Sequence, residues 1–173
     1  MRREEITIEE LLKRYEGGER NFAGIYLCYT DNVFNSVNLS VINLRGASFR
    51  DFGFYSLPRV VLSRADLSDV FLYRQMLEGA SFSGANLSNV CLSQSNLRNS
   101  NLSWCNLSGS DLYNACFWGA NLSGANLTGA NMESVWLDGV KLSNVNLTGA
   151  VNVFLEGVIY DNTTMPDGSV RSD

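Results

Sequence analysis

The fold of this protein is decided by a stretch in which residues 120–129 read ANLSGANLTG, two copies of one five-residue unit. The unit continues in both directions without a change of register, so that every fifth residue from Leu62 to Leu147 is large and apolar. These eighteen positions hold fifteen Leu residues together with Phe82, Phe117 and Met132. Self-similarity at a fixed period is the signature of a repeat architecture.

A period of five matches neither an α-helix at 3.6 residues per turn nor a β-strand with its period of two. On a helix the large residues would wind around the whole surface, and on a flat strand successive ones would lie on opposite faces. A chain that turns a corner once per unit brings all of them to a common axis. The sequence therefore predicts a coil with an apolar interior.

The corner positions support this prediction. The residue two after the central one is Gly or Asn in twelve of the eighteen units, and these residues tolerate a positive φ in a tight turn. They are Gly79, Gly84, Asn89, Asn99, Gly109, Asn114, Gly119, Gly124, Gly129, Gly139, Asn144 and Gly149. The residue two before the central one is usually small, which leaves room for a narrow interior.

The repeated unit resembles that of the pentapeptide-repeat proteins, whose pattern is A-(D/N)-L-X-X, over about residues 20–157. The resemblance implies an all-β solenoid, a right-handed quadrilateral β-helix with four units per coil. Seven earlier centres, beginning at Phe22 and Leu27, bring the total to 25 and predict about six coils. The segments 9–22 and 160–168 are similar to the ends of cyanobacterial members.

The chain is predicted to form an N-terminal capping helix (1–19), the repeat body (20–157) and a C-terminal capping segment and tail (158–173). Thr7 and Glu10 match a capping box, and Gly17 follows the last apolar position of the helix. Its apolar face consists of Ile8, Leu11, Leu12 and Tyr15. Surplus residues before Phe34 and around Pro58 are expected to bulge outward at corners.

Four units per coil would stack residues that are 20 positions apart. Two sides then carry polar ladders, such as the column Asp66, Asn86, Asn106. The other two sides carry outward aromatic and apolar residues, which often mark interaction sites. The candidate interaction residues are Phe71, Tyr73, Met76, Trp104, Tyr113, Trp118 and Trp136. The sequence leaves open whether they are free or covered by loops, by the tails or by a second copy.

The chain lacks the usual chemistry of an enzyme. It contains no His, and its four Cys residues do not have the spacing of a metal site or of a disulfide framework. We therefore expect no catalytic residue, no metal and no cofactor. The mean hydropathy is −0.05, no apolar run reaches the ~18–20 residues of a membrane span, and the charged start lacks the core of a signal peptide. The interpretation is a cytoplasmic protein without membrane contact.

Two functions are compatible with this pattern. The first is a structural or protein-interaction module that presents its aromatic sides to an unidentified protein. The second comes from the family resemblance, since some members mimic B-DNA and inhibit DNA gyrase, which would make this protein a DNA-mimic inhibitor of DNA gyrase or of another DNA-binding protein. Residues 20–155, however, contain eight acidic and eight basic residues, so the coil body has no net charge. The net charge of −5 comes from the two ends of the chain. A neutral rod is a poor substitute for DNA, and no basic stripe indicates nucleic-acid binding. Monomer and homodimer both remain open.

Overall fold

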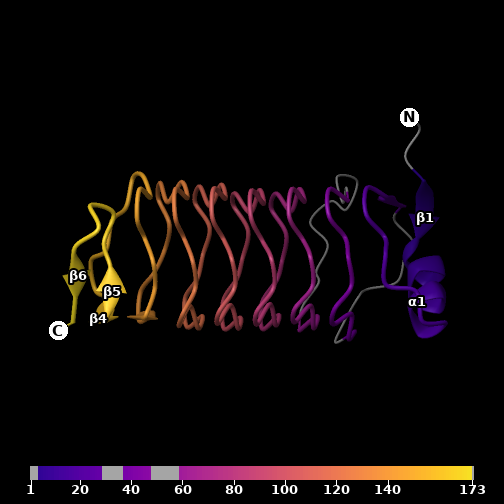
Figure 1. Ribbon diagram of the computed structural model, residues 1–173, viewed down its shortest axis with the longest axis horizontal. Helices are drawn as coiled ribbons and strands as arrows, with labels where there is room; N and C mark the ends of the chain where they lie inside the picture. The colour runs from indigo at the N-terminus through magenta and orange to yellow at the C-terminus, as the bar shows by residue number, and fades with distance from the viewer. Residues whose placement is uncertain (1–3, 29–36, 48–58, 173) are drawn as a thin grey trace.

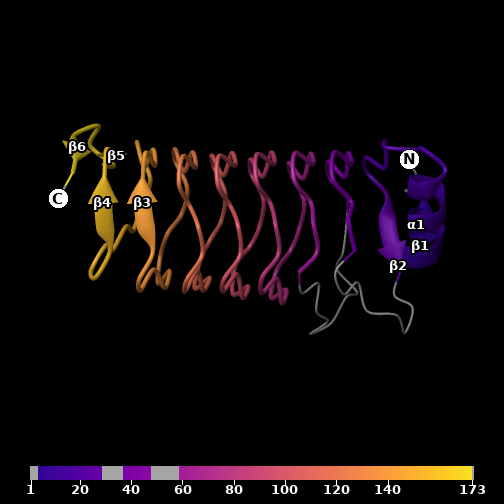
Figure 2. The same cartoon turned by 90° about the horizontal axis from the view of Figure 1, so that it is seen from below.

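The computed structural model describes residues 4–28, 37–47 and 59–172. The chain winds into a straight row of stacked coils, with helix α1 at one end and the last strands at the other (Figures 1 and 2). The predicted outward bulges before Phe34 and around Pro58 lie outside the described residues.

Between Val61 and Val151, each turn of the coil takes four five-residue units. Parallel bridges join residues that are 20 positions apart, for example Ser81 to Asn101 and Asn101 to Asn121. The structure nevertheless contains little regular β-structure, since the strands of the described residues form three two-stranded sheets and the other coil contacts are single bridges. Two of every five residues lie in a turn in most units, so the strands in the described part of the chain are at most three residues long. The predicted solenoid of stacked coils is thus confirmed, whereas the prediction of an all-β structure overstated the strand content.

The central residues point to a common axis, as predicted. Leu87, Leu107 and Leu127 are at most 1% exposed, and Phe82 and Phe117 are equally buried. Backbone hydrogen bonds run between coils, as from Leu87 N–H to the Asn106 carbonyl at 2.7 Å. Apolar burial and satisfied backbone groups therefore come from the same stacking.

The corners are tight turns with a left-handed residue. The residue two after the centre has a positive φ in all eighteen units from Arg64 to Gly149. This is the third position of a type II turn, as in the bond from Ala85 N–H to the Phe82 carbonyl at 2.9 Å. Twelve of these corners carry the expected Gly or Asn; the others are Arg64, Asp69, Arg74, Gln94, Trp104 and Ser134.

At the N-terminal end, strand β1 (Glu5–Thr7) pairs in parallel with β2 (Tyr26–Cys28) and leads into helix α1 (Ile8–Glu16). The Thr7 hydroxyl accepts a hydrogen bond from the Glu10 N–H at 3.1 Å, which confirms Thr7 as the N-cap. Ile8 and Leu11 are buried, and Leu12 and Tyr15 pack partly buried on the core. The helix therefore covers the apolar end of the first coil, whereas β1 was not foreseen from the sequence.

At the C-terminal end, strand β3 (Lys141–Ser143) pairs in parallel with β4 (Ile159–Asp161). Strands β5 (Thr163–Thr164) and β6 (Val170–Arg171) then form an antiparallel pair. Tyr160 lies against Leu142 only 18 positions earlier and is 8% exposed. The end of the rod is thus closed by a coil that no longer follows the five-residue rule.

The four sides of the coil are named here by the central residues beneath them. Sides A, B, C and D follow one another along the chain and lie over Leu102, Leu107, Leu112 and Phe117, respectively, and over the residues 20 positions away from each.

Candidate protein-interaction surface

Side B is a closed polar ladder. The amide of Asn106 donates to Asn86 Oδ1 at 3.3 Å and accepts from the amide of Asn126 at 3.2 Å. The Asn106 oxygen also accepts from the backbone N–H of Ser108 at 3.2 Å. These groups bond to one another and to the backbone. The amide oxygen of Asn106 is thus already engaged within the protein.

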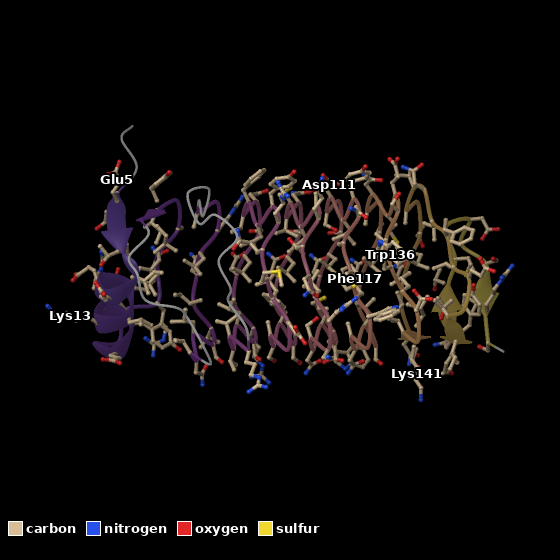
Figure 3. All side chains as sticks on the ribbon, turned by 180° about the vertical axis from the view of Figure 1, so that it is seen from behind. Glu5, Lys13, Asp111, Phe117, Trp136 and Lys141 are labelled. Carbon is tan, nitrogen blue, oxygen red and sulfur yellow. The ribbon has the colours of Figure 1, made fainter. Side chains whose placement is uncertain are left out.

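Side D has a different outer surface. Its bridge column is Met76, Asn96, Cys116 and Trp136. In Figure 3, Trp136 lies between Asp111 of side C and Lys141 of side A. The column along its border with side A is Glu78, Arg98, Trp118 and Asp138.

Contacts between the outer side chains hold side D in place. The Arg98 guanidinium carbon lies 4.8 Å from the ring centroid of Trp118, a cation–π distance, and Arg98 Nε donates to Cys116 Sγ at 3.4 Å. Trp136 Nε1 donates to Asn114 Oδ1 at 3.3 Å. Both Trp rings remain accessible, since Trp118 is 45% and Trp136 is 56% exposed.

Two hollows lie on this side, one before and one after Trp136. The first has a volume of about 350 Å³, and Arg98, Asn114, Cys116, Trp118 and Trp136 are among its lining residues. The second has a volume of about 810 Å³ and includes Asn114, Trp136, Asp138, Phe154 and Glu156. Trp136 therefore lines both hollows.

The candidate residues from the sequence do not form one patch. Met76, Trp118 and Trp136 lie on side D or its border. Phe71 and Tyr73 lie on side C, with ring centroids 6.0 Å apart, and the Tyr73 hydroxyl donates to Gln94 Oε1 at 3.2 Å. Gln94 in turn lines the first hollow of side D.

Tyr113 and Trp104 complete the set. Tyr113, 39% exposed, occupies the same corner column as Tyr73. Trp104 lies apart, at the corner between sides A and B, with its ring directly over Gly124 of the next coil. Six of the seven candidates thus border sides C and D, and Trp104 belongs to another surface.

One exposed residue was missed by sequence reasoning. Phe154 is 70% exposed and lines the second hollow. Asn152 occupies the position of the central Leu of the repeat. The 20-residue spacing therefore no longer predicts the side on which Phe154 lies. Only the short last coil brings it beside Trp136.

Cys91, Cys105 and Cys116 are free thiols that lie on different parts of the coil. Cys105 points inward, and burial raises the pKa of its thiol to about 12. Cys91 and Cys116 are partly exposed on sides C and D. Across residues 4–28, 37–47 and 59–172, no group of three or more His, Cys, Asp or Glu side chains is placed to hold a metal ion. In the same part of the chain, no helix has the length and apolar character needed to span a membrane.

The family model for pentapeptide repeats matches this chain in eight copies, over residues 56–94, 92–124 and 105–144. The chain belongs to the pentapeptide-repeat family. No curated protein sequence gives a significant match to this pentapeptide-repeat protein.

Solved structures of the same architecture are similar to this pentapeptide-repeat protein. QnrB1, a plasmid-mediated fluoroquinolone resistance protein, is 18% identical over 84% of this chain and 70% of its own, with a TM-score of 0.65. HetL of the cyanobacterium Nostoc sp. strain PCC 7120, involved in heterocyst differentiation regulation, is 24% identical over 96% of this chain and 100% of its own, with a TM-score of 0.37. Rfr23 of the cyanobacterium Cyanothece 51142 is 25% identical over 89% and 99%, with a TM-score of 0.43. The QnrB1 comparison shows the shared fold.

Proposed function

We propose that this protein is a non-catalytic interaction module that binds another protein through side D. The observation that carries the proposal is the pair Trp118 and Trp136, which line one hollow of about 350 Å³ while remaining 45% and 56% exposed. Tryptophan is enriched among the residues that dominate binding energy at protein interfaces. The second hollow is likewise lined by two exposed rings, those of Trp136 and Phe154.

The hollow is also held in shape before a partner arrives. Arg98 packs over Trp118, and Asn114 accepts a hydrogen bond from Trp136. The interior of the coil beneath is filled by Phe117 and its buried neighbours. A preorganised surface loses less conformational entropy on binding, which favours affinity.

The test is a pull-down from the organism of origin with tagged protein. The double variant Trp118→Ser/Trp136→Ser should lose the captured partner. The matched control is Trp104→Ser, which removes a ring that is 69% exposed at a different corner, and it should retain the partner. An identical partner list for the double variant and the unchanged protein would count against the proposal.

A second candidate is inhibition of DNA gyrase by DNA mimicry, since the fold is shared with the fluoroquinolone resistance protein QnrB1. The charge of the body argues against it. Residues 59–155 carry six acids and five bases, whereas B-DNA presents one negative charge per ~1.7 Å of its axis. A supercoiling assay distinguishes the two functions, because inhibition at low micromolar protein would favour mimicry.

Further features belong to the same proposal. We propose a right-handed quadrilateral course of about six coils, with residues 1–19 and 158–173 as the caps of a repeat body at 20–157. The protein would act in the cytoplasm, without a cofactor. Sedimentation would decide between monomer and homodimer.

A further inference from the structure

Charges of opposite sign lie on the two hollows of side D. Arg98 lines the first hollow, and Asp138 and Glu156 line the second. Arg98, Trp118 and Asp138 occupy one column and lie in three successive coils. At roughly 4.8 Å per coil, Arg98 and Asp138 are about 10 Å apart along the axis. Along this column the surface is therefore positively charged at Arg98, aromatic at Trp118 and negatively charged at Asp138.

These charges have no ion-pair partner within the described chain. Between residues of the described ranges, ion pairs join Arg14 to Glu4 and Glu19, and Arg45 to Asp69, and none of them includes Arg98, Asp138 or Glu156. Arg98 instead lies over Trp118 and bonds to Cys116. Asp138 and Glu156 are exposed at the rim of their hollow. Each end of the surface formed by the two hollows can thus accept an opposite charge from outside.

The middle of the surface suits apolar groups and a peptide backbone. The rings of Trp118 and Trp136 provide the apolar contact area. The side-chain amides of Gln94 and Asn114 lie at the edge of the first hollow, where they can hydrogen-bond to backbone groups. A nucleic-acid strand fits less well, because two carboxylates at one end would repel its phosphates.

We infer that side D binds a peptide segment of a partner protein in which apolar residues lie between an acidic and a basic side chain. The acidic residue faces Arg98, and the basic residue faces Asp138 and Glu156. This inference rests on the proposed function and adds the chemistry of the partner. Complementary charges of this kind select the partner and its register more than they raise affinity.

The experiment uses three synthetic peptides with the same central Leu-Phe-Leu. One carries Asp and Lys at its two ends, the second carries two Asp, and the third carries two Lys. Binding is followed by NMR titration of the Trp118 and Trp136 indole N–H signals. The unchanged protein should prefer the mixed peptide by about threefold, the size expected for an exposed ion pair.

Charge reversal should change the preference in a defined way, whichever direction the peptide runs. Arg98→Glu makes both ends acidic, and the peptide with two Lys should then bind best. Asp138→Lys/Glu156→Lys makes both ends basic, and the peptide with two Asp should then bind best. The matched control is Glu78→Lys, in the same column but outside both hollows, which should leave the order of the three peptides unchanged.

Several results would overturn the inference: no peptide shifts the indole signals at millimolar concentration, the three peptides bind equally, or Glu78→Lys changes the order as strongly as the other variants. Binding of an oligo-dT strand that depends on Arg98 would assign the surface to nucleic acid instead. If the three peptides bind equally while capture of a protein still requires Trp118 and Trp136, the inference fails and the proposed function stands. If capture is independent of both rings, the proposed function fails as well.

Discussion

Sides B and D lie over the same apolar interior but differ in their outer surfaces. On side B the outward Asn residues bond to their neighbours above and below, as Asn106 does with Asn86 and Asn126. On side D the equivalent positions hold Asn96, Cys116 and Trp136, and the polar ladder is replaced by rings and hollows. The comparison indicates that inward positions determine the coil, whereas outward positions can depart from the repeat without a change of fold.

The largest effect is expected in the interior, and it should be the same beneath both sides. Leu107→Ala beneath side B and Leu97→Ala beneath side D each leave a cavity in a fully buried column, at a cost of about 3 kcal/mol. Urea unfolding followed by circular dichroism measures both losses. Stability losses for the two variants that differ by more than about 2 kcal/mol, which is most of the range observed for such substitutions, would show that the interior is not equivalent beneath the two sides.

The next effect separates two corners that border side B. Gly124→Ala places a Cβ only 2.4 Å from Cε3 of the Trp104 ring, at a φ of +71°, and we expect a loss of about 2 kcal/mol. Gly129→Ala is the matched control, because its φ is +67° and no atom lies within 4 Å of the added Cβ, so that about 1 kcal/mol should be lost. Combining Gly124→Ala with Trp104→Ser should reduce the loss to the control value. Equal losses for the two single variants would show that the ring yields freely.

A smaller effect tests the ladder itself. Asn106→Ala removes hydrogen bonds to Asn86, Asn126 and the Ser108 backbone, at a net cost of about 1 kcal/mol. Cys116→Ala, at the corresponding position of side D, removes only the weak contact with Arg98 and should cost less than about 0.5 kcal/mol. Chemical denaturation of both variants provides the comparison. A larger loss for Cys116→Ala would contradict the structural role given to side B.

The smallest stability effect is expected where the binding effect is largest. Trp136→Ser removes a ring that is 56% exposed and has one side-chain hydrogen bond, to Asn114, so the unfolding free energy should fall by about 0.5 kcal/mol. Thermal melting together with the pull-down checks both halves of this prediction. A melting temperature as low as that of Leu97→Ala would make Trp136 a structural residue.

Much of the fold was readable from the sequence, for a local reason. Each unit carries its own inward Leu, and Gly or Asn at a corner supplies the positive φ of the turn. Trp104 and the five other exceptional corners adopt the same conformation because the stacked coils above and below impose it. Helix α1 was equally readable, since Thr7 and the spacing of Ile8 and Leu11 are local signals.

The period of five and the burial of the central residues were thus determined by the sequence alone, because they depend on neighbours within one unit. The sequence also indicated that Trp118 and Trp136 point outward. Their meeting around one hollow, the contact of Arg98 with Trp118, and the position of Phe154 beside Trp136 were decided only by the tertiary structure. These contacts join residues some 20 positions apart, and the last coil closes after 18, so that no local pattern contains them.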